Sequence, residues 1–130
     1  MRGAYADFLD EAAALLKRSK LKAAADGFRT SREAWLALAH IAMPDDVLLC
    51  REARELIVKR HHLFVDCGGD ALGDMRAIDA RLSEIRATVA KDFPMSDSQV
   101  KTVHEAMSAQ VMKIHDIEFD AVKAMQSAMG

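Results

Sequence analysis

Apolar residues recur at alternating steps of three and four along residues 75–89, and this spacing narrows the choice of fold more than any other pattern in the chain. It places apolar side chains on one helix face and is typical of the seam of a coiled-coil-like pair. A second apolar stripe at helical spacing occupies residues 100–125. Ser96 and Gln99 have the spacing of a capping box that opens this second helix, directly after Pro94. Because the loop is short, we predict that the two long helices are antiparallel neighbours.

Turn and capping residues divide the first part of the chain into further helices. An apolar stripe at helical spacing predicts a first helix, and its members are Tyr5, Phe8, Leu9, Ala12 and Leu16. A short helical piece over residues 20–25 is expected to follow and to end at Asp26-Gly27, a dipeptide typical of turns. Thr30 and Glu33 have the spacing of another capping box, in which each side chain accepts a hydrogen bond from the backbone amide of the other. We therefore predict that a new helix begins at Thr30.

Proline and glycine predict the next two breaks. Pro44 cannot continue the helix before it. Asp45 or Asp46 is placed to cap the following helix, where free N–H groups and the helix dipole favour a negative charge. That helix is expected to end at residues 67–69, Cys-Gly-Gly, because glycine adopts a left-handed conformation without penalty. The next helix then begins near Asp70.

The composition agrees with a helical fold. Hydrophobic residues make up 51% and charged residues 29% of the 130 residues, which is typical of neither a disordered tail nor a membrane protein. The chain has only six glycines and two prolines, fewer than the many turns of a β-sheet protein usually need. We predict an all-α protein with a single helical domain over residues 1–130, built as a bundle of about five helices with a long C-terminal antiparallel helical hairpin.

Charge and cysteine content limit the partners and the cellular setting. The 18 basic and 20 acidic residues leave a net charge of -2, so the strongly basic face of a nucleic-acid-binding protein is not expected. No apolar run approaches the roughly 18 residues needed to cross a bilayer, and Asp7 comes too early for a signal peptide. Cys50 and Cys67 do not suggest a disulfide scaffold, which favours a reducing compartment. We expect a cytoplasmic protein with no nucleic-acid and no membrane partner.

The segments, taken in order, resemble a known family. The residues Arg2-Gly3-Ala4-Tyr5-Ala6-Asp7-Phe8-Leu9-Asp10-Glu11-Ala12 are similar to the FR-x-x-Y-x-x-FL-x-E-A start of a helical C-terminal domain. That domain occurs in proteins similar to butirosin biosynthesis protein H. Further similar segments are Ser31 to Ala39 with Trp35, Met43-Pro44-Asp45-Asp46, Asp92 to Asp97, and Ile117-Glu118 with Ala121.

The resemblance has consequences for function. In that family, an acyltransferase-like region with a catalytic cysteine and histidine precedes the helical domain. Met1-Arg2 already lies inside the helical part, so the resemblance implies that the catalytic half is absent here. Cys50 and Cys67 match no nucleophile motif of the family, and no catalytic residue is carried over to them. The resemblance therefore implies an accessory domain rather than an enzyme on its own.

Histidine spacing argues against a metal site. Di-iron helix bundles need a glutamate three residues before a histidine, and no histidine here has one. His115 and Glu118 show only the reverse order. His61 and His62 are consecutive, so their side chains point about 100° apart and cannot form a helical ligand pair. We expect no metal, no cofactor and no catalytic residue.

Two opposite charges fall on apolar helix faces. At about 100° per residue, Glu118 lies at the centre of the apolar arc of the last predicted helix, and Arg60 lies within that of the third. An unpaired buried charge costs several kcal/mol, so one interpretation is a direct Arg60–Glu118 pair, or two side chains that extend to solvent. The other interpretation is a ligand-binding polar pocket formed by Arg60, His115 and Glu118.

These observations lead to two hypotheses of function. The first is a non-catalytic helical interaction domain, associated with itself or with an acyltransferase-like protein of specialised-metabolite biosynthesis. The alternative is a small-molecule-binding helix bundle with its pocket around Arg60, His115 and Glu118, with acyl transfer as a related activity. We also expect a homodimer, because the last two helices extend beyond what the others cover. The expected interface residues are Leu72, Met75, Ile117, Phe119 and Met125.

Overall fold

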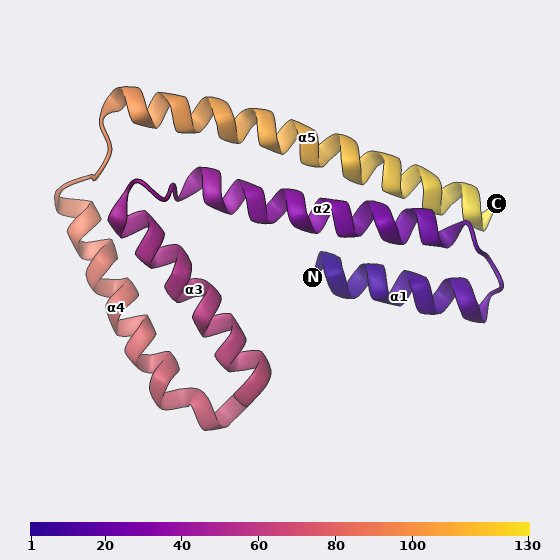
Figure 1. The fold of residues 1–130 in the computed structure, drawn as a ribbon, viewed down its shortest axis with the longest axis horizontal. Coiled ribbons are helices and arrows are strands. Elements are labelled where there is room, and N and C mark those ends of the chain that lie inside the picture. The colour runs from indigo at the N-terminus through magenta and orange to yellow at the C-terminus, as the bar shows by residue number, and fades with distance from the viewer. The chain divides into compact units, whose positions relative to one another are not determined.

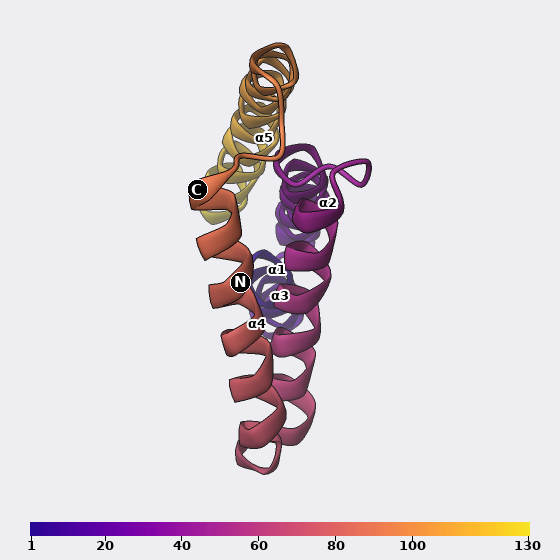
Figure 2. The same ribbon diagram turned by 90° about the vertical axis from the view of Figure 1, so that its left-hand side faces the viewer.

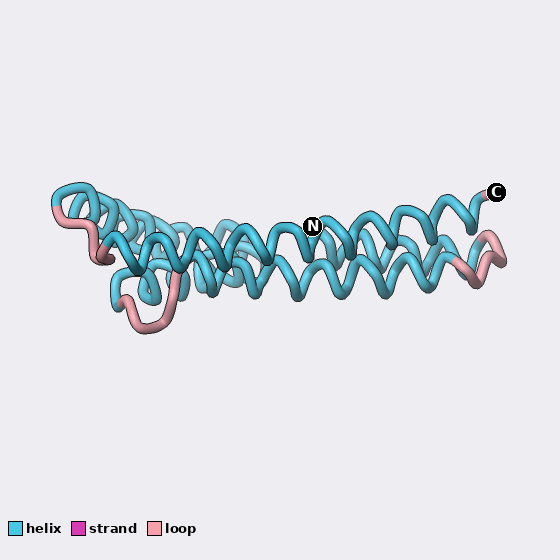
Figure 3. Tube along the Cα trace, turned by 90° about the horizontal axis from the view of Figure 1, so that it is seen from above, coloured by secondary structure: helices cyan, strands magenta, loops and turns pink.

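The computed structural model describes all residues from 1 to 130, and it contains helices and connecting loops but no strand (Figures 1 and 3). The elements are α1 (Arg2–Leu15), α2 (Leu21–Ala42), α3 (Leu48–Cys67), the 3-10 helix η1 (Gly68–Ala71), α4 (Leu72–Lys91) and α5 (Asp97–Met129). The predicted all-α class is confirmed. The residues group into two compact units: unit 1 comprises Met1–Leu38 and Glu105–Gly130, and unit 2 comprises Ala39–His104. The single domain over residues 1–130 stays a prediction.

The predicted break at Asp26-Gly27 is wrong, because α2 continues through both residues. Thr30 does not cap a helix; its hydroxyl donates a hydrogen bond to the carbonyl of Asp26, 3.0 Å away, inside α2. Gly27 instead permits a close approach between two helices. A Cβ atom at this position would lie 2.7 Å from the Cβ of Ala121 on α5, which is closer than two carbon atoms can pack. The glycine therefore serves packing rather than chain reversal.

Small residues dominate the core of unit 1, where α1, α2 and α5 lie alongside one another (Figure 1). The buried residues of this core are Ala6, Leu9, Ala13, Leu21, Ala24, Ala25, Phe28, Ala121 and Ala128. The face that α1 buries differs from the predicted stripe, because Tyr5 and Phe8 remain exposed and two alanines are buried instead. Alanine lets the helix backbones approach closely, so the side chains of Tyr5 and Phe8 lie at the edge of the contact.

Contacts within unit 1 fix the helix directions. Arg2 at the start of α1 contacts Glu118, and Arg18 just beyond its end donates to the carbonyl oxygens of Ala128 and Met129, both at 2.8 Å. The chain therefore runs in the same direction in α1 as in α5. Gly27 packs on Ala121, while residues further along α2 contact earlier positions of α5, so α2 is antiparallel to α5. The Arg18 guanidinium also neutralises the negative end of the α5 dipole.

Unit 2 contains an antiparallel hairpin of α3 and α4, which lie side by side in Figures 1 and 2. Gly68 ends α3 with a positive φ of 54°, as expected for a glycine stop signal. The buried side chains of α4 are Met75, Ile78 and Ile85, three members of the predicted stripe. Within this unit α4 packs on α3 and η1. The predicted C-terminal hairpin of α4 and α5 stays a prediction.

The start of α3 differs from the prediction. Neither Asp45 nor Asp46 caps the helix, since the N-cap residue is Val47 and no side chain caps it. The Asp45 carboxylate instead pairs with the buried Arg54 guanidinium, which also donates to the carbonyl of Met43. The hydrogen bond from Arg54 holds the pKa of Asp45 below its usual value. Arg54 therefore fastens the loop after α2 to the side of α3.

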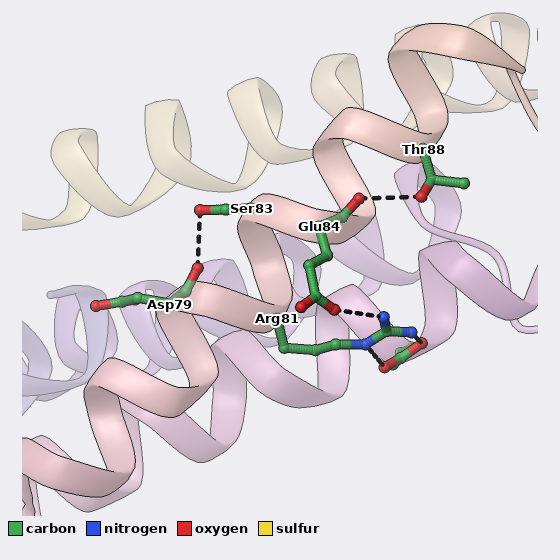
Figure 4. Close-up of polar contacts among 6 residues, drawn as sticks. Asp79, Arg81, Ser83, Glu84 and Thr88 are labelled. Carbon is green, nitrogen blue, oxygen red and sulfur yellow. Dashed lines mark hydrogen bonds and ion pairs between the residues drawn. The ribbon is translucent and has the colours of Figure 1, made fainter.

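Polar contacts join the outer faces of the hairpin. Arg81 donates from Nε to Glu52 on α3 at 2.6 Å and from Nη1 to Glu84 at 2.9 Å; the contact with Glu84 is drawn in Figure 4. The hydroxyl groups of Ser83 and Thr88 donate hydrogen bonds to the backbone carbonyls of Asp79 and Glu84, one turn earlier in α4 (Figure 4). Of these contacts, the one with Glu52 joins the two helices, and it adds little stability because solvent screens an exposed ion pair.

The predicted capping box at the start of α5 is confirmed. The Gln99 side-chain oxygen accepts a hydrogen bond from the Ser96 amide at 2.9 Å, and the Ser96 hydroxyl accepts one from the Gln99 amide at 3.3 Å. The predicted end of α2 before Pro44 is confirmed as well, with Ala42 as its last residue. None of the helices combines the length and the apolar character needed to cross a membrane.

Candidate functional site

The most strongly connected polar group of unit 1 is the Glu118 carboxylate on α5. Arg2 donates to it from Nε at 2.7 Å and from Nη2 at 3.0 Å, one bond to each carboxylate oxygen. Ser31 donates from its hydroxyl at 2.6 Å and Trp35 from its indole nitrogen at 3.1 Å, both from α2. One carboxylate therefore joins all three helices of the unit. It lies one helical turn before Ala121, the residue on which Gly27 packs.

The surroundings of Glu118 favour its ionised form. Burial alone would raise the pKa of Glu118, but the hydrogen bonds from Arg2, Ser31 and Trp35, together with the charge of Arg2, lower the pKa to about 2. The group is therefore ionised at neutral pH and cannot deliver a proton. Its oxygens already accept four hydrogen bonds, which leaves little capacity to abstract a proton or bind a ligand. The arrangement is suited to fastening helices rather than to acid–base catalysis.

His115 lies on the outward face of α5 and does not take part in the Glu118 network. Its side chain is exposed, its Nδ1 atom is 3.1 Å from an oxygen of Asp116, and its ring stacks on Phe119 with centroids 5.9 Å apart. The ammonium group of Lys123 lies 4.3 Å from the centre of the same Phe119 ring. A histidine, an aromatic ring and two charges thus form a small exposed group on α5.

This outward face of α5 also carries apolar side chains. Met112, Phe119, Val122 and Met129 are all exposed, at helical spacings of seven, three and seven. With His115 and Gln126 they form one stripe, named here the α5 stripe. In unit 1, α1 and α2 both lie on one side of α5 (Figure 1), and the α5 stripe faces away from the core that they share.

Arg60 lies in unit 2, at the edge of a pocket in the α3–α4 hairpin. Its guanidinium forms two hydrogen bonds with Asp79 of α4, at 2.7 and 3.3 Å, and its side chain is 46% exposed. The pocket has a volume of about 340 Å³. It is lined by Arg60, Phe64, Gly68, Gly69, Leu72, Met75, Arg76 and Asp79. Arg76 forms no ion pair, so one positive charge on this rim is uncompensated.

The direct Arg60–Glu118 pair is replaced by other ion pairs, whereas the ligand pocket around Arg60, His115 and Glu118 stays a prediction. Each charge has its own partner within its own unit: Asp79 for Arg60, and Arg2 for Glu118. The pocket beside Arg60 includes neither His115 nor Glu118. The helical periodicity placed Glu118 correctly on a partly buried face, since its side chain is 24% exposed. Periodicity alone does not determine which helix meets that face, so the partners could not be identified.

Sequence reasoning missed the donors that hold Glu118. Arg2 is 116 residues away from it, Ser31 is 87 and Trp35 is 83, and no local spacing connects residues so far apart. Arg2, Ser31 and Trp35 do all stand in segments that carry the family resemblance, which is the one signal that sets them apart. Asp79 lies at the edge of the apolar stripe of α4, and no local spacing connects it with Arg60 on α3.

The two cysteines and the possible metal ligands do not form a reactive or metal-binding site. Burial, and the negative charge of Asp46, raise the pKa of the Cys50 thiol, which makes it a poor nucleophile. Cys67 is exposed, and the two cysteines are not bonded to each other. No group of three histidine, cysteine or acidic side chains lies close enough to hold a metal ion.

Comparisons with models of protein families, with curated proteins and with solved structures find no match to this chain.

Proposed function

We propose that the chain is a non-catalytic helical interaction domain and that the α5 stripe is its docking element. The observation that supports this function is the exposure of four large apolar side chains in register along one helix face. From Met112 to Met129 the stripe extends for roughly 26 Å at 1.5 Å per residue. Apolar residues exposed singly are ordinary, whereas four of them aligned on one helix face over this length are typical of a surface that a partner covers.

The chemistry of the chain supports an interaction role over a catalytic one. The one carboxylate with a strongly shifted pKa, Glu118, is saturated by donors from two other helices. The better buried thiol, Cys50, is held in its neutral form. The resemblance to the helical domain of the butirosin biosynthesis protein H-like family adds the class of partner: an acyltransferase-like protein of specialised-metabolite biosynthesis. The proposal includes this partner and association of the chain with itself.

The expected interface is revised by the structure. Met75 is buried on α4, while Ile117 and Met125 are partly buried within unit 1. Leu72 is exposed but belongs to unit 2, whereas Phe119 belongs to unit 1. Of the five residues predicted for the interface, only Phe119 lies on the α5 stripe.

A pair of matched substitutions tests the function. Phe119→Glu places a charge in the centre of the α5 stripe, and Phe93→Glu places one on a loop; the two side chains are similarly exposed, at 51% and 55%. Sedimentation analysis of the chain alone, and mixed with an acyltransferase-like protein encoded beside its gene, should show an association that Phe119→Glu weakens and Phe93→Glu does not. A chain that stays monomeric and binds no such protein would overturn the proposal.

The α3–α4 pocket supports a second candidate function, the binding of a small apolar molecule with an anionic group. Phe64, Leu72 and Met75 supply apolar walls, and the unpaired Arg76 supplies a positive charge at the rim. Calorimetric titration with octanoate tests this candidate. Arg76→Gln should abolish the heat of binding, whereas Arg86→Gln, an exposed and equally unpaired arginine of α4, should not change it. Equal binding by both variants, or none by the unmodified chain, would refute this function.

A further inference from the structure

We infer that the partner of the α5 stripe is a second copy of this chain, docked antiparallel about a two-fold axis. The inference rests on the proposed function, which makes the stripe a docking element. Its six residues are Met112, His115, Phe119, Val122, Gln126 and Met129, and all six are exposed. Their steps of three and four are those of the a and d positions of a heptad repeat, the geometry by which two helices interlock.

The order of apolar and polar residues in the stripe selects one register. When two such helices run antiparallel, each a position meets a d position of the other copy. Met112 then meets the partner's Met129, and Phe119 meets the partner's Val122, which gives apolar layers. His115 meets the partner's Gln126, which gives a polar layer that can form a hydrogen bond. Every layer therefore joins side chains of like character, so no polar group is buried against an apolar one.

Antiparallel alignments shifted by one heptad no longer pair side chains of like character. A slip of one heptad in one direction opposes His115 to the partner's Phe119, and a slip in the other direction opposes Val122 to the partner's Gln126. The first slip also opposes Met129 to the partner's Glu105, and the second leaves Met112 without an opposing residue. The pattern of the stripe thus favours a single antiparallel alignment over its alternatives, as polar positions do in coiled coils generally.

Charges beside the stripe agree with the same alignment. Asp116 and Lys123 occupy equivalent heptad positions on one flank, and both are exposed. In the antiparallel register that matches the layers, Asp116 lies opposite the partner's Lys123. The two-fold axis repeats this contact, so the dimer contains it twice. On the other flank Glu118 is already held by Arg2, and it opposes the partner's Met125, so no like charges meet.

A parallel pair lacks this complementarity. In a parallel pair the flanking contact of Lys123 would be the partner's Glu118, whose oxygens are already occupied by Arg2, Ser31 and Trp35. Asp116 would oppose the partner's Val111 and gain nothing. The antiparallel dimer instead pairs Asp116 with the partner's Lys123, two exposed side chains whose contacts within the chain are with His115 and with the Phe119 ring. The contact is short, at the small end of specific interfaces, so we expect a dissociation constant in the micromolar range.

Charge reversal tests the arrangement. Asp116→Lys alone would bring like charges together twice per dimer, and so would Lys123→Asp alone. Exposed pairs contribute roughly 0.2–1 kcal/mol each, so loss of two pairs and gain of two repulsions should weaken dimerisation about tenfold. An equimolar mixture of the two single variants should recover, because both contacts between unlike chains are again attractive. Asp120→Lys, on the same helix but outside the contact, serves as the control and should leave dimerisation unchanged.

Sedimentation equilibrium over a range of concentrations measures these effects, with circular dichroism to show that each variant is folded. Weakened single variants whose mixture recovers to within about threefold of the unmodified chain support the inference. A mixture that stays as weak as its components overturns the antiparallel alignment. An unmodified chain that is monomeric, yet binds an acyltransferase-like protein in a Phe119-dependent way, overturns self-association and leaves the proposed function intact. A dimer that Phe119→Glu does not affect overturns both.

Discussion

Replacing Glu118 by glutamine tests the idea that one carboxylate fastens the three helices of unit 1. The amide keeps the shape of the side chain but removes the charge that Arg2, Ser31 and Trp35 stabilise. The pKa of Glu118 falls from an ordinary 4.5 to about 2, and at about 1.36 kcal/mol per pKa unit this interval sets an upper limit of roughly 3 kcal/mol. Arg2 is 44% exposed, so solvent screening reduces the expected loss to about 2 kcal/mol.

The pH dependence gives a sharper test than the stability at neutral pH. Because the folded-state pKa lies below the ordinary value, the carboxylate stabilises the fold fully above about pH 4.5, and this stabilisation is lost as the pH falls toward about 2. The difference in the free energy of unfolding between the unmodified chain and Glu118→Gln should therefore shrink by more than half between pH 7 and pH 3.

Urea unfolding followed by circular dichroism at both pH values provides the measurement. Glu105→Gln is the matched control, because Glu105 lies on the same helix, is exposed and forms no ion pair. The reasoning fails if Glu118→Gln is within about 0.5 kcal/mol of the unmodified chain at pH 7, since the network would then contribute no more than an ordinary surface pair. It also fails if the difference between the two chains does not change with pH.

Three further substitutions follow from the packing of the fold. Gly27→Ala should lower the free energy of unfolding by about 1–3 kcal/mol despite its better helix propensity, because its Cβ would meet that of Ala121, and Ala121→Gly in the same chain should restore most of the loss in thermal unfolding. Arg54→Met should cost about 1–2 kcal/mol in urea unfolding by leaving the Met43 carbonyl without its donor, and an unchanged midpoint would contradict the anchoring of the loop. Ser96→Ala should cost about 1 kcal/mol through loss of the α5 cap, and amide hydrogen exchange confined to the first turn should rise; uniform protection would speak against the cap.

Local signals predicted the ends of several helices correctly. Pro44 stops α2 through the geometry of its own ring, Gly68 ends α3 because it adopts a positive φ, and Ser96 with Gln99 caps α5 by reciprocal hydrogen bonds. Each of these effects depends on atoms within a few residues of the signal. The all-α class follows for the same reason, since helical periodicity is a property of neighbouring residues along the chain.

The same kind of local signal failed where a packed neighbour decides the outcome. Asp26-Gly27 and Thr30 have the composition of a turn followed by a cap, yet α2 runs through them. Helical hydrogen bonding and the contact of Gly27 with Ala121 outweigh the local preference for a turn. The second helix of the contact lies 94 positions further along the chain, from residue 27 to residue 121, so its effect is invisible in the local pattern.

For the candidate site, too, the sequence predicted some features and only the tertiary structure shows the others. The sequence by itself determined that Glu118 lies on a face with apolar neighbours, because angular position on a helix depends only on spacing. Only the tertiary structure decided that Arg2, Ser31 and Trp35 hold it and that Arg60 pairs with Asp79. A charge on a helix face needs a partner, but many partners satisfy that need equally well in sequence. Which one does so depends on how the helices pack, and that depends on the sum of many contacts between residues distant in the chain.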